Sequence, residues 1–256
     1  MEKLQINKDC LYFNGYKPCS YHKKENVHCK ECKHYKKTKS RILVLKRGAA
    51  GEVIRNTPLL RKIRSEYENC KITWVTDYPE LLPINYVDCI LQYTWENINI
   101  VLSEEFDLLL SLDKEQETCA IANKIESKKK KGFLLDKYGK IIPADSDADH
   151  KWETGIFDNL MLENKKHYVE EIFEICGWDW NGERYIIGEY EKLNINFKTS
   201  KKVIGLNTGA GSLWPTRIWP TDCWEKLIEL LKEKYNIILL GGPDEHKKNS
   251  YLKEKF

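Results

Sequence analysis

The chain has 256 residues, with 42 Lys and Arg against 39 Asp and Glu, and 41% of its residues are hydrophobic. This length allows one large domain or two modest ones, and 8 Trp and 14 Tyr are too many for a disordered chain. No apolar run approaches the ~20 residues of a transmembrane helix, and the opening MEKLQINKDC lacks the apolar core of a secretory signal. We therefore expect a cytoplasmic protein whose nine Cys are reduced thiols or metal ligands.

Residues 1–40 differ in composition from the rest, and we predict that they form a separate module. Residues 10–41 hold nine Lys and Arg against two Glu, whereas the whole chain has a net charge of only +3. The basic excess is local, so it does not indicate a general nucleic-acid-binding surface. Four Cys follow the pattern C-x8-C-x9-C-x2-C in this segment, namely Cys10, Cys19, Cys29 and Cys32.

This cysteine pattern is typical of a structural zinc site, because a Cys-x2-Cys pair with two further Cys within reach suits tetrahedral coordination. A module of this size with few aliphatic residues cannot bury a core of its own and usually needs a metal or disulfides. An iron–sulfur cluster uses the same four thiolates and remains an alternative, as does a metal-free basic segment.

From residue 41 onward the pattern alternates between short β-rich runs and helical periodicity, which predicts a parallel sheet flanked by helices. A polar loop is expected at 145–153, and Gly177 is expected to stop a helix. The expected strands are 42–46, 72–75, 90–93, 108–112 and 132–135, and the expected helices are 53–67, 115–125 and 157–176.

After a linker at 181–201, a second α/β unit is expected to begin. It contains strands at 203–207 and 237–240, a helix at 221–235 with Thr221 as N-cap, and the start of another helix near Glu245. Two parallel strands cannot cover both faces of a sheet, so this unit is expected to be incomplete. The predicted domains are therefore 1–40, 41–190 and 191–256.

Two loops are candidate ligand sites. The first consists of small residues after the first strand, Gly48, Ala49, Ala50 and Gly51, followed by Glu52 in the first helical turn. Such a loop lets a ligand approach the backbone at the carboxyl edge of the sheet, where open α/β folds bind ligands. Alternatively, Glu52 only complements the helix dipole.

The second loop follows the strand at 203–207 and is rich in glycine. It contains Thr208, Gly209, Ala210 and Gly211, and Arg217 comes shortly after it. Backbone N–H groups with a following Arg suit a diphosphate. The alternative is a structural loop with an exposed Arg.

These two loops, in this order, resemble glycosyltransferase family 9, the ADP-heptose–lipopolysaccharide heptosyltransferases. The matching stretches are ILVLKRGAAGEVIRNTPLLRKIRSEYENCKITWVTD, VIGLNTGAGSLWPTRIWPTDCWEKLIELL and IILLGGPDE. The resemblance covers roughly 41–256 and implies a GT-B fold, in which two Rossmann-like domains face each other across the active site. It also implies inverting transfer of a heptose or related sugar from an ADP-sugar, with no cofactor for catalysis.

The resemblance also implies roles for single residues. Glu52 falls where the family usually has an Asp that acts as general base, and Arg217 falls on a basic position that contacts the donor diphosphate. Thr208, Gly209, Ala210 and Gly211 fall on the phosphate loop, and Asp244 and Glu245 on the turn near the nucleoside. The family's later Asp-Ser-Gly…His segment has no counterpart in this sequence.

Two charged stretches have ordinary alternatives. Asp145-Ser146-Asp147 has the spacing of a metal-binding Asp pair, but it lies in a predicted acidic loop and is expected to be solvated. Lys128–Lys131 is expected to be a solvated loop; attraction to anionic phospholipid is the alternative.

The resulting hypothesis is a cytoplasmic glycosyltransferase, peripheral to the inner face of the membrane. Its partners would be an ADP-sugar donor and a lipid-linked oligosaccharide acceptor such as the lipopolysaccharide core, and nucleic acid would not be among them. The rival hypothesis is a catalytically inactive scaffold whose basic Cys-rich module contacts nucleic acid or a protein partner.

Overall fold

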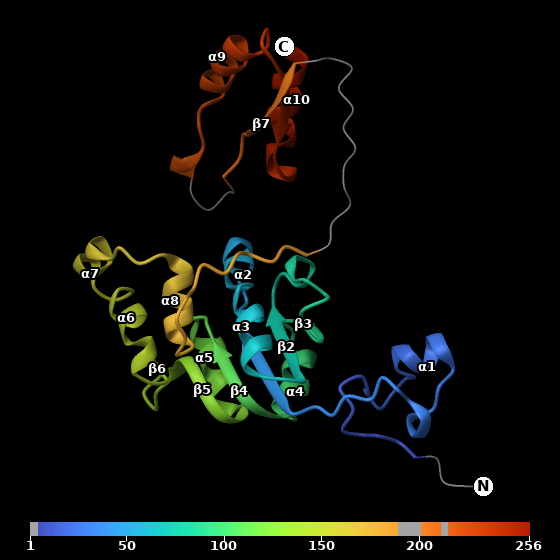
Figure 1. Ribbon diagram of the computed structural model, residues 1–256. Helices are drawn as coiled ribbons and strands as arrows, with labels where there is room; N and C mark the ends of the chain where they lie inside the picture. Colours follow the sequence, from blue (N-terminus) through green and yellow to red (C-terminus); the bar gives the residue numbers. More distant parts are fainter. Residues whose placement is uncertain (1–4, 189–200, 211–214) are drawn as a thin grey trace. The chain divides into compact units, whose positions relative to one another are not determined.

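The computed structural model describes residues 5–188, 201–210 and 215–256 (Figure 1). The chain divides into two compact units, Met1–Tyr190 and Glu191–Phe256. Within the described parts, no helix is long and apolar enough to cross a membrane.

The first unit is built on a six-stranded sheet with the order β3-β2-β1-β4-β5-β6. Strands β1 to β5 pair in parallel, and β6 is antiparallel to β5. Because the strands on the two sides of β1 are reached in opposite directions, the carboxyl ends of β1 and β4 form the switch point where doubly wound folds bind ligands. The strands are β1 (Ser40–Leu45), β2 (Cys70–Thr76), β3 (Cys89–Gln92), β4 (Glu105–Ser111), β5 (Glu126–Leu135) and β6 (Ile141–Pro143).

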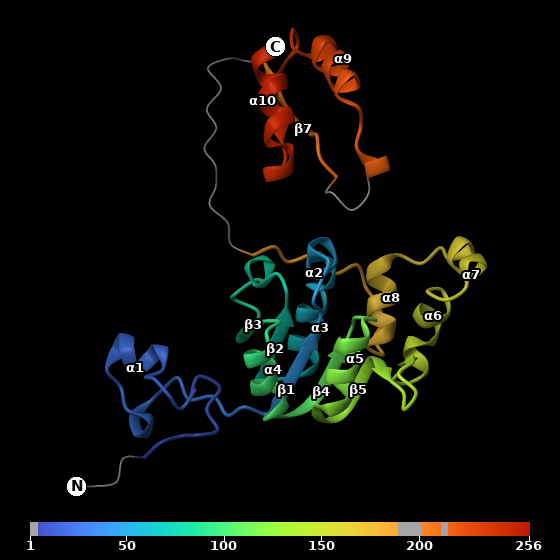
Figure 2. The ribbon, with the colours of Figure 1, turned by 180° about the vertical axis from the view of Figure 1, so that it is seen from behind.

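Helices cover both faces of this sheet, which confirms the predicted α/β class (Figures 1 and 2). Successive residues of β1 point to opposite faces. Ile42 and Val44 belong to a core cluster with α2, α3 and α8, whereas Leu43 and Leu45 belong to a cluster with α4. The helices are α2 (Ala50–Asn56), α3 (Leu59–Glu66), α4 (Trp95–Leu102), α5 (Gln116–Lys124) and α8 (Tyr168–Ile175).

Two helices predicted as continuous are interrupted. The helix expected at 53–67 divides into α2 and α3 at Pro58, which has no N–H to continue the hydrogen-bond ladder. The helix expected at 157–176 divides into α7 (Asp158–Glu163) and α8. His167 caps α8, its ring accepting from the Val169 N–H while Glu170 accepts from the His167 N–H.

Other differences lie around β5. This strand begins at Glu126, so the four lysines at 128–131 belong to a strand and the predicted solvated loop is wrong. Gly132 is required there, because its φ is +95° and a Cβ would lie 1.9 Å from the Ser111 carbonyl oxygen of β4. The expected loop at 145–153 is largely helical, with η3 (Ser146–Ala148) and α6 (Asp149–Glu153), and neither β6 nor α4 was predicted.

The second unit contains two parallel strands, β7 (Lys202–Asn207) and β8 (Tyr235–Leu240), which confirms the expected strands within a residue or two. Its helices are α9 (Thr221–Leu231) and α10 (His246–Lys255). The buried core of the unit consists of Leu206, Ile228 and Leu252. Pro220, rather than Thr221, occupies the N-cap of α9. Most of the expected linker lies outside the described residues.

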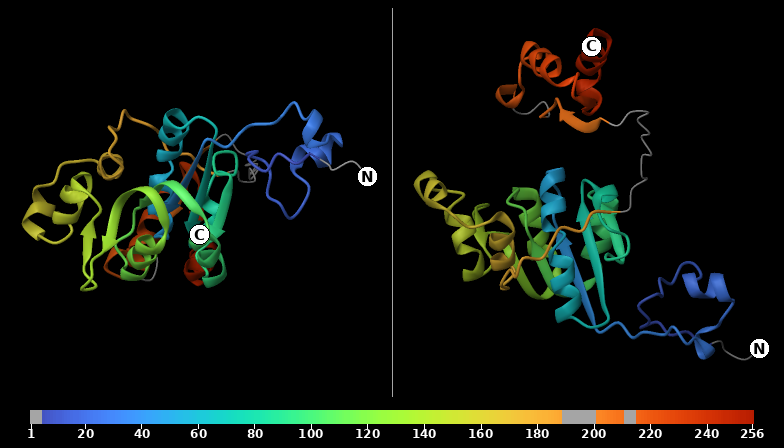
Figure 3. Two further views of the ribbon diagram at one scale, coloured as in Figure 1. Left: turned by 90° about the horizontal axis from the view of Figure 1, so that it is seen from below. Right: turned by 45° about the horizontal axis from the view of Figure 1, so that its top comes forward.

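The amino-terminal segment has a different character, visible in both views of Figure 3. It contains α1 (Ser20–Glu25) and the short η1 (Cys29–Glu31), and no residue between 5 and 40 is buried. Turns and hydrogen bonds hold it in place, in contrast to the sheet, whose strands are covered on both faces.

Candidate active site

The centre of the candidate site is a buried lysine at the end of β1. Lys46 follows the strand directly, and only 4% of its side chain is exposed. Its Nζ donates to Asp113 at 2.5 Å and to Glu52 at 2.6 Å. Asp113 follows β4, so β1 and β4 deliver a lysine and a carboxylate to the switch point of the sheet.

Glu52 is the predicted catalytic residue, and the structure places it beside this pair. Its Oε2 accepts from Lys46, whereas its Oε1 lies 3.8 Å from Arg55, one helical turn further along α2. Its side chain is 36% exposed, compared with 1% for Asp113. Glu52 is therefore the carboxylate of the trio that a substrate can reach.

The backbone of Arg47 also holds Asp113. Its Oδ2 accepts from the Arg47 backbone N–H at 2.5 Å. The Arg47 side chain donates to Asp77 and Glu117 and stacks on Tyr93. These contacts fix the start of the small-residue loop relative to β2 and α5.

The electrostatics favour an ionised Lys46–Asp113 pair. Burial alone would lower the pKa of Lys46, but the Asp113 charge and the hydrogen bonds to Asp113 and Glu52 outweigh it and hold the pKa above its usual value. Burial raises the pKa of Asp113, and Lys46 is the main group that opposes this rise. Removing either member would leave the other as an uncompensated buried charge.

Further polar side chains surround Glu52. Tyr168 of α8 lies under the Arg55 guanidinium, 3.9 Å from ring centroid to Cζ, and burial raises its pKa. Lys151 donates to the buried Glu171 at 2.6 Å. Burial, together with the nearby charge of Lys151, lowers the pKa of Lys114. The region thus combines one accessible carboxylate with several cations, a set suited to moving a proton from a polyhydroxylated or anionic substrate.

The small-residue loop has one steric requirement. A Cβ on Gly48 would lie 3.1 Å from the Tyr78 ring, whereas a Cβ on Gly51 would meet nothing within 4 Å. Ala49 is the N-cap of α2 and Ala50 is its first residue.

In the second unit, the described part of the glycine-rich loop is tied to α10. The buried Thr208 donates its hydroxyl to Asn249 at 2.6 Å, and Lys248 donates to the Thr208 carbonyl at 2.6 Å. A Cβ on Gly209 would lie 2.2 Å from the Glu245 carboxyl carbon. Lys248 and Asn249 were not among the predicted site residues.

The remaining predicted donor-site residues have varied surroundings. Glu245 accepts from the Gly242 N–H at 2.8 Å, so its carboxylate closes the turn after β8. Ala210, Arg217 and Asp244 are exposed. Gly211 lies outside the described residues.

The Asp145-Ser146-Asp147 stretch is explained by a buried lysine. Lys131 of β5 contacts Asp145 at 2.5 Å and also Asp147. Lys128 pairs with Asp107 at 2.7 Å. The expectation of an acidic solvated loop is therefore wrong, because these carboxylates neutralise a lysine of the sheet.

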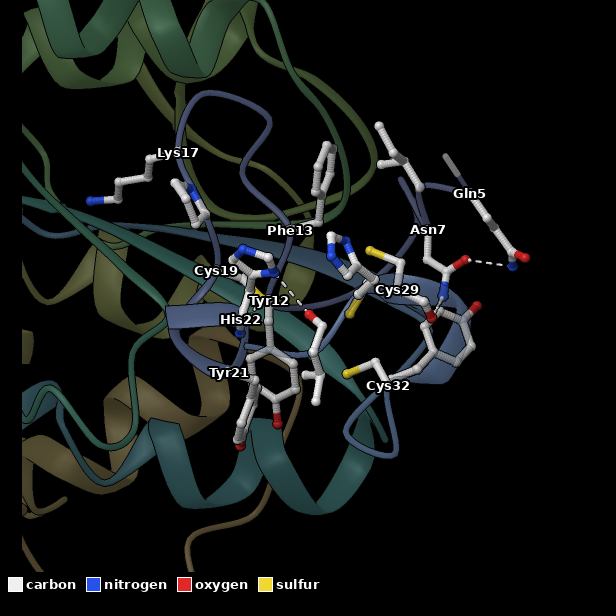
Figure 4. Close-up of a pocket in the computed structure, with 16 residues that line it drawn as sticks. Gln5, Asn7, Tyr12, Phe13, Lys17, Cys19, Tyr21, His22, Cys29 and Cys32 are labelled. Atoms are coloured by element: carbon white, nitrogen blue, oxygen red, sulfur yellow. Dashed lines mark hydrogen bonds between the residues drawn. The ribbon is translucent and has the colours of Figure 1, made fainter. Parts of the chain in front are cut away.

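The predicted metal ligands Cys10, Cys19, Cys29 and Cys32 line one pocket of about 260 Å³ (Figure 4). All four are free, partly buried thiols. Within the described ranges, however, no group of three or more His, Cys, Asp or Glu side chains is arranged to hold a metal ion. The predicted zinc site is therefore not supported by the side-chain arrangement as it stands.

The signals for Lys46 and Asp113 were present in the sequence but ambiguous. Each is a charged residue directly after a run of aliphatic residues, in VLKRG and LLLSLDK. Polar residues at the carboxyl ends of parallel strands meet at one edge of the sheet. Which strands are neighbours, however, depends on the topology.

The fold of the chain is similar to those of several solved structures. No protein-family model and no curated protein matches the chain. Among solved structures, a family 9 glycosyltransferase from Veillonella parvula matches with a TM-score of 0.59 and 17% identity, over 86% of this chain and 67% of that one. Escherichia coli heptosyltransferase WaaC with ADP-2-deoxy-2-fluoro heptose matches with a TM-score of 0.53 and 16% identity, over 84% and 74% of the two chains.

A third match is E. coli ADP-heptose lipopolysaccharide heptosyltransferase II, with a TM-score of 0.55 and 13% identity, over 84% of this chain and 69% of that one. These likenesses confirm the predicted resemblance at the level of the fold. The chain has the fold of family 9 glycosyltransferases.

Proposed function

We propose that this protein is a glycosyltransferase that transfers a heptose or related sugar from an ADP-sugar to a lipopolysaccharide core or similar glycan acceptor. Transfer would invert the anomeric centre and need no catalytic metal. The observation that carries the proposal is the Glu52–Lys46–Asp113 trio at the switch point of the sheet. Further support comes from the fold, since structures that share it include heptosyltransferases solved with ADP or an ADP-heptose analogue.

In this mechanism Glu52 is the general base. Lys46 holds one carboxylate oxygen, which leaves the other to accept a proton from an acceptor hydroxyl. The acceptor oxygen forms a bond to the anomeric carbon as the bond to the ADP oxygen breaks on the opposite face. Asp113 neutralises Lys46, and Lys46 positions Glu52.

The donor diphosphate is assigned to the glycine-rich loop of the second unit. Arg217 and the amides of 209–211 would stabilise the charge that grows on the departing ADP. Lys248 donates to the Thr208 carbonyl and so fixes the start of this loop. Asp244 and Glu245 would lie on the nucleoside side of the site.

A lipid-linked acceptor fits an exposed apolar cluster before and within α7. Ile156, Phe157, Met161 and Leu162 are each more than half exposed. Large exposed apolar patches mark protein or membrane contacts, and we assign this one to the lipid surface that carries the acceptor. Of the lysine run, Lys131 is buried and Lys128 is paired with Asp107.

Acceptor-dependent release of ADP from an ADP-heptose donor tests the proposal. We expect the purified chain to release ADP only when a lipopolysaccharide-core acceptor is present, and a coupled assay would measure the rate. If the protein bound RNA but neither bound nor consumed ADP-sugars, the scaffold hypothesis would replace the enzyme.

A further inference from the structure

The amino-terminal module lacks a buried core, which is the usual source of stability. None of its described residues from 5 to 40 is buried, yet the segment forms α1, η1 and a bridge between Cys10 and Lys37. Segments this small need a metal, disulfides or a partner to stay folded. Since all four of its cysteines are free thiols, a disulfide does not fill this role.

Six metal-type donors line a single pocket within the module. They are the four thiols and the ring of His22, with a sixth, the ring of His28, edge to face against His22 at 5.2 Å between ring centroids (Figure 4). By contrast, His34 is engaged elsewhere, stacked on Tyr21 and 2.7 Å from Glu25. The donors come from three separate segments of the chain, so their convergence is a property of the fold.

Hydrogen bonds between these segments hold the donors around the pocket. The Cys19 thiol accepts from the His22 N–H at 3.4 Å, and Asn7 donates to the Cys29 carbonyl at 3.2 Å. The Cys10 N–H donates to the Asn7 carbonyl at 3.1 Å, which links the segment that carries Cys10 to the same set of hydrogen bonds. These bonds hold together the segments that carry the donors.

His22 has the orientation of a metal ligand. Its Nδ1 lies 2.8 Å from the Val27 carbonyl oxygen, which can only accept, so Nδ1 carries the hydrogen. In the neutral ring this leaves the Nε2 lone pair free. A histidine that donates its other ring N–H to a backbone carbonyl is the usual arrangement in metal sites.

We propose that Cys19, His22, Cys29 and Cys32 bind one zinc ion that holds this module together. Zinc in structural sites takes four ligands, and these four form two pairs with the same spacing of three residues, each within a single helical turn. The first pair spans the N-cap and third residue of α1, and the second spans η1 and its C-cap. Cys10, on an earlier turn, and His28, at the N-cap of η1, stand outside these pairs and are the donors left over.

Zinc binding is coupled to side-chain movement in this module. The donors line the pocket without forming a closed ligand set, so the ion must draw them inward. The site therefore forms as the metal binds, in the manner of small zinc modules that order with their metal. Deprotonation of the three thiols accompanies binding.

Elemental analysis of the full chain, purified without added metal, tests the proposal. We expect about one zinc per chain, with a strong loss in Cys29→Ser and His22→Ala. Cys10→Ser is the matched control, and we expect it to retain the metal. Reconstitution with cobalt(II) should give the visible absorption of a tetrahedral thiolate site, and His22→Ala should alter that spectrum.

Limited proteolysis keeps the test informative when a variant misfolds. Chelation of the wild-type protein should make residues 5–40 sensitive to protease while the sheet stays resistant, and zinc should restore protection. Absence of metal, or iron with acid-labile sulfide in place of zinc, would overturn the proposal. Loss of zinc from Cys10→Ser but not from His22→Ala would overturn the ligand set in favour of four thiolates.

Discussion

Lys46 and Lys131 both lie buried in the first unit, and each contacts two carboxylates. The partners of Lys46 arrive from α2 and from the end of β4, and one of them is almost fully buried while the other is 36% exposed. The partners of Lys131 both come from the turn at Asp145 and Asp147, and each is 38% exposed.

The two clusters contain the same types of residue, a lysine and two carboxylates, at different positions in the fold. Around Lys131, local carboxylates neutralise a lysine whose strand lies within the sheet. Around Lys46, the buried partner Asp113 neutralises the lysine, and the second partner, Glu52, is the one for which we propose a role at the switch point. A buried lysine with two carboxylates is therefore not itself evidence of a site; its position in the topology decides.

The largest expected effect follows from breaking the buried pair. Lys46→Met should lower the free energy of unfolding of the first unit by about 3–5 kcal/mol, because Asp113 is left as a buried charge. Urea denaturation would measure it. The double variant Lys46→Met/Asp113→Leu should recover most of this loss without recovering activity, and a single-variant loss under about 1 kcal/mol would refute the pairing.

Arg217 is the opposite case, an exposed cation on a loop. Arg217→Ala should weaken ADP binding by about 1.5–3 kcal/mol, the range for hydrogen bonds to charged groups. Arg217→Lys should recover part of the loss, since it keeps the charge but not the paired donors. Calorimetry would measure the affinities, and equal affinity for wild type and Arg217→Ala would remove the diphosphate contact.

Lys131→Met should cost less than Lys46→Met, about 1–2 kcal/mol, because Asp145 and Asp147 are partly exposed and can regain water. Sugar transfer should be unchanged. The same denaturation experiment measures the stability difference. A cost equal to that of Lys46→Met would mean that the two clusters are energetically alike.

The smallest effect is expected at the surface pair of Asp107 and Lys128. The hydrogen bond from Lys128, together with one from the Arg41 N–H, lowers the pKa of Asp107. Asp107 therefore stabilises the fold at pH values above its unfolded pKa, and this contribution is lost as the pH falls through the folded pKa. Asp107→Asn should cost about 0.2–1 kcal/mol at neutral pH and nothing in strong acid, which denaturation at several pH values would show.

Much of the fold could be predicted because its signals are local. The apolar run before Lys46, the small residues from Gly48 to Gly51 and the stop at Gly177 each indicate an element without knowledge of the rest. Pro58 was present in the sequence as a break signal, yet the periodicity of apolar residues on both sides outweighed it. The strand at 128–131 was not predicted because four consecutive lysines are typical of solvated loops. In the structure, Lys128 and Lys131 contact carboxylates and Lys130 donates to backbone carbonyl oxygens.

The candidate site was predictable only in part. Glu52 follows from the loop spacing and the family resemblance, since both depend on neighbours in sequence. Its partner Lys46 is bound to a carboxylate 67 residues away, and that contact exists because β1 and β4 are adjacent. No short-range pattern encodes this adjacency, so the sequence marked Asp113 only as a charged residue after an aliphatic run, and the structure identified it as the partner of Lys46.

The central claim is that Glu52, positioned by Lys46, takes the acceptor proton. The most direct measurement is the turnover of Glu52→Gln beside Glu126→Gln, a matched change at an exposed position at the start of β5. We predict that Glu52→Gln loses about 10²–10⁴-fold in kcat while its ADP affinity changes little. Glu126→Gln should behave as wild type. Wild-type turnover in Glu52→Gln would contradict it.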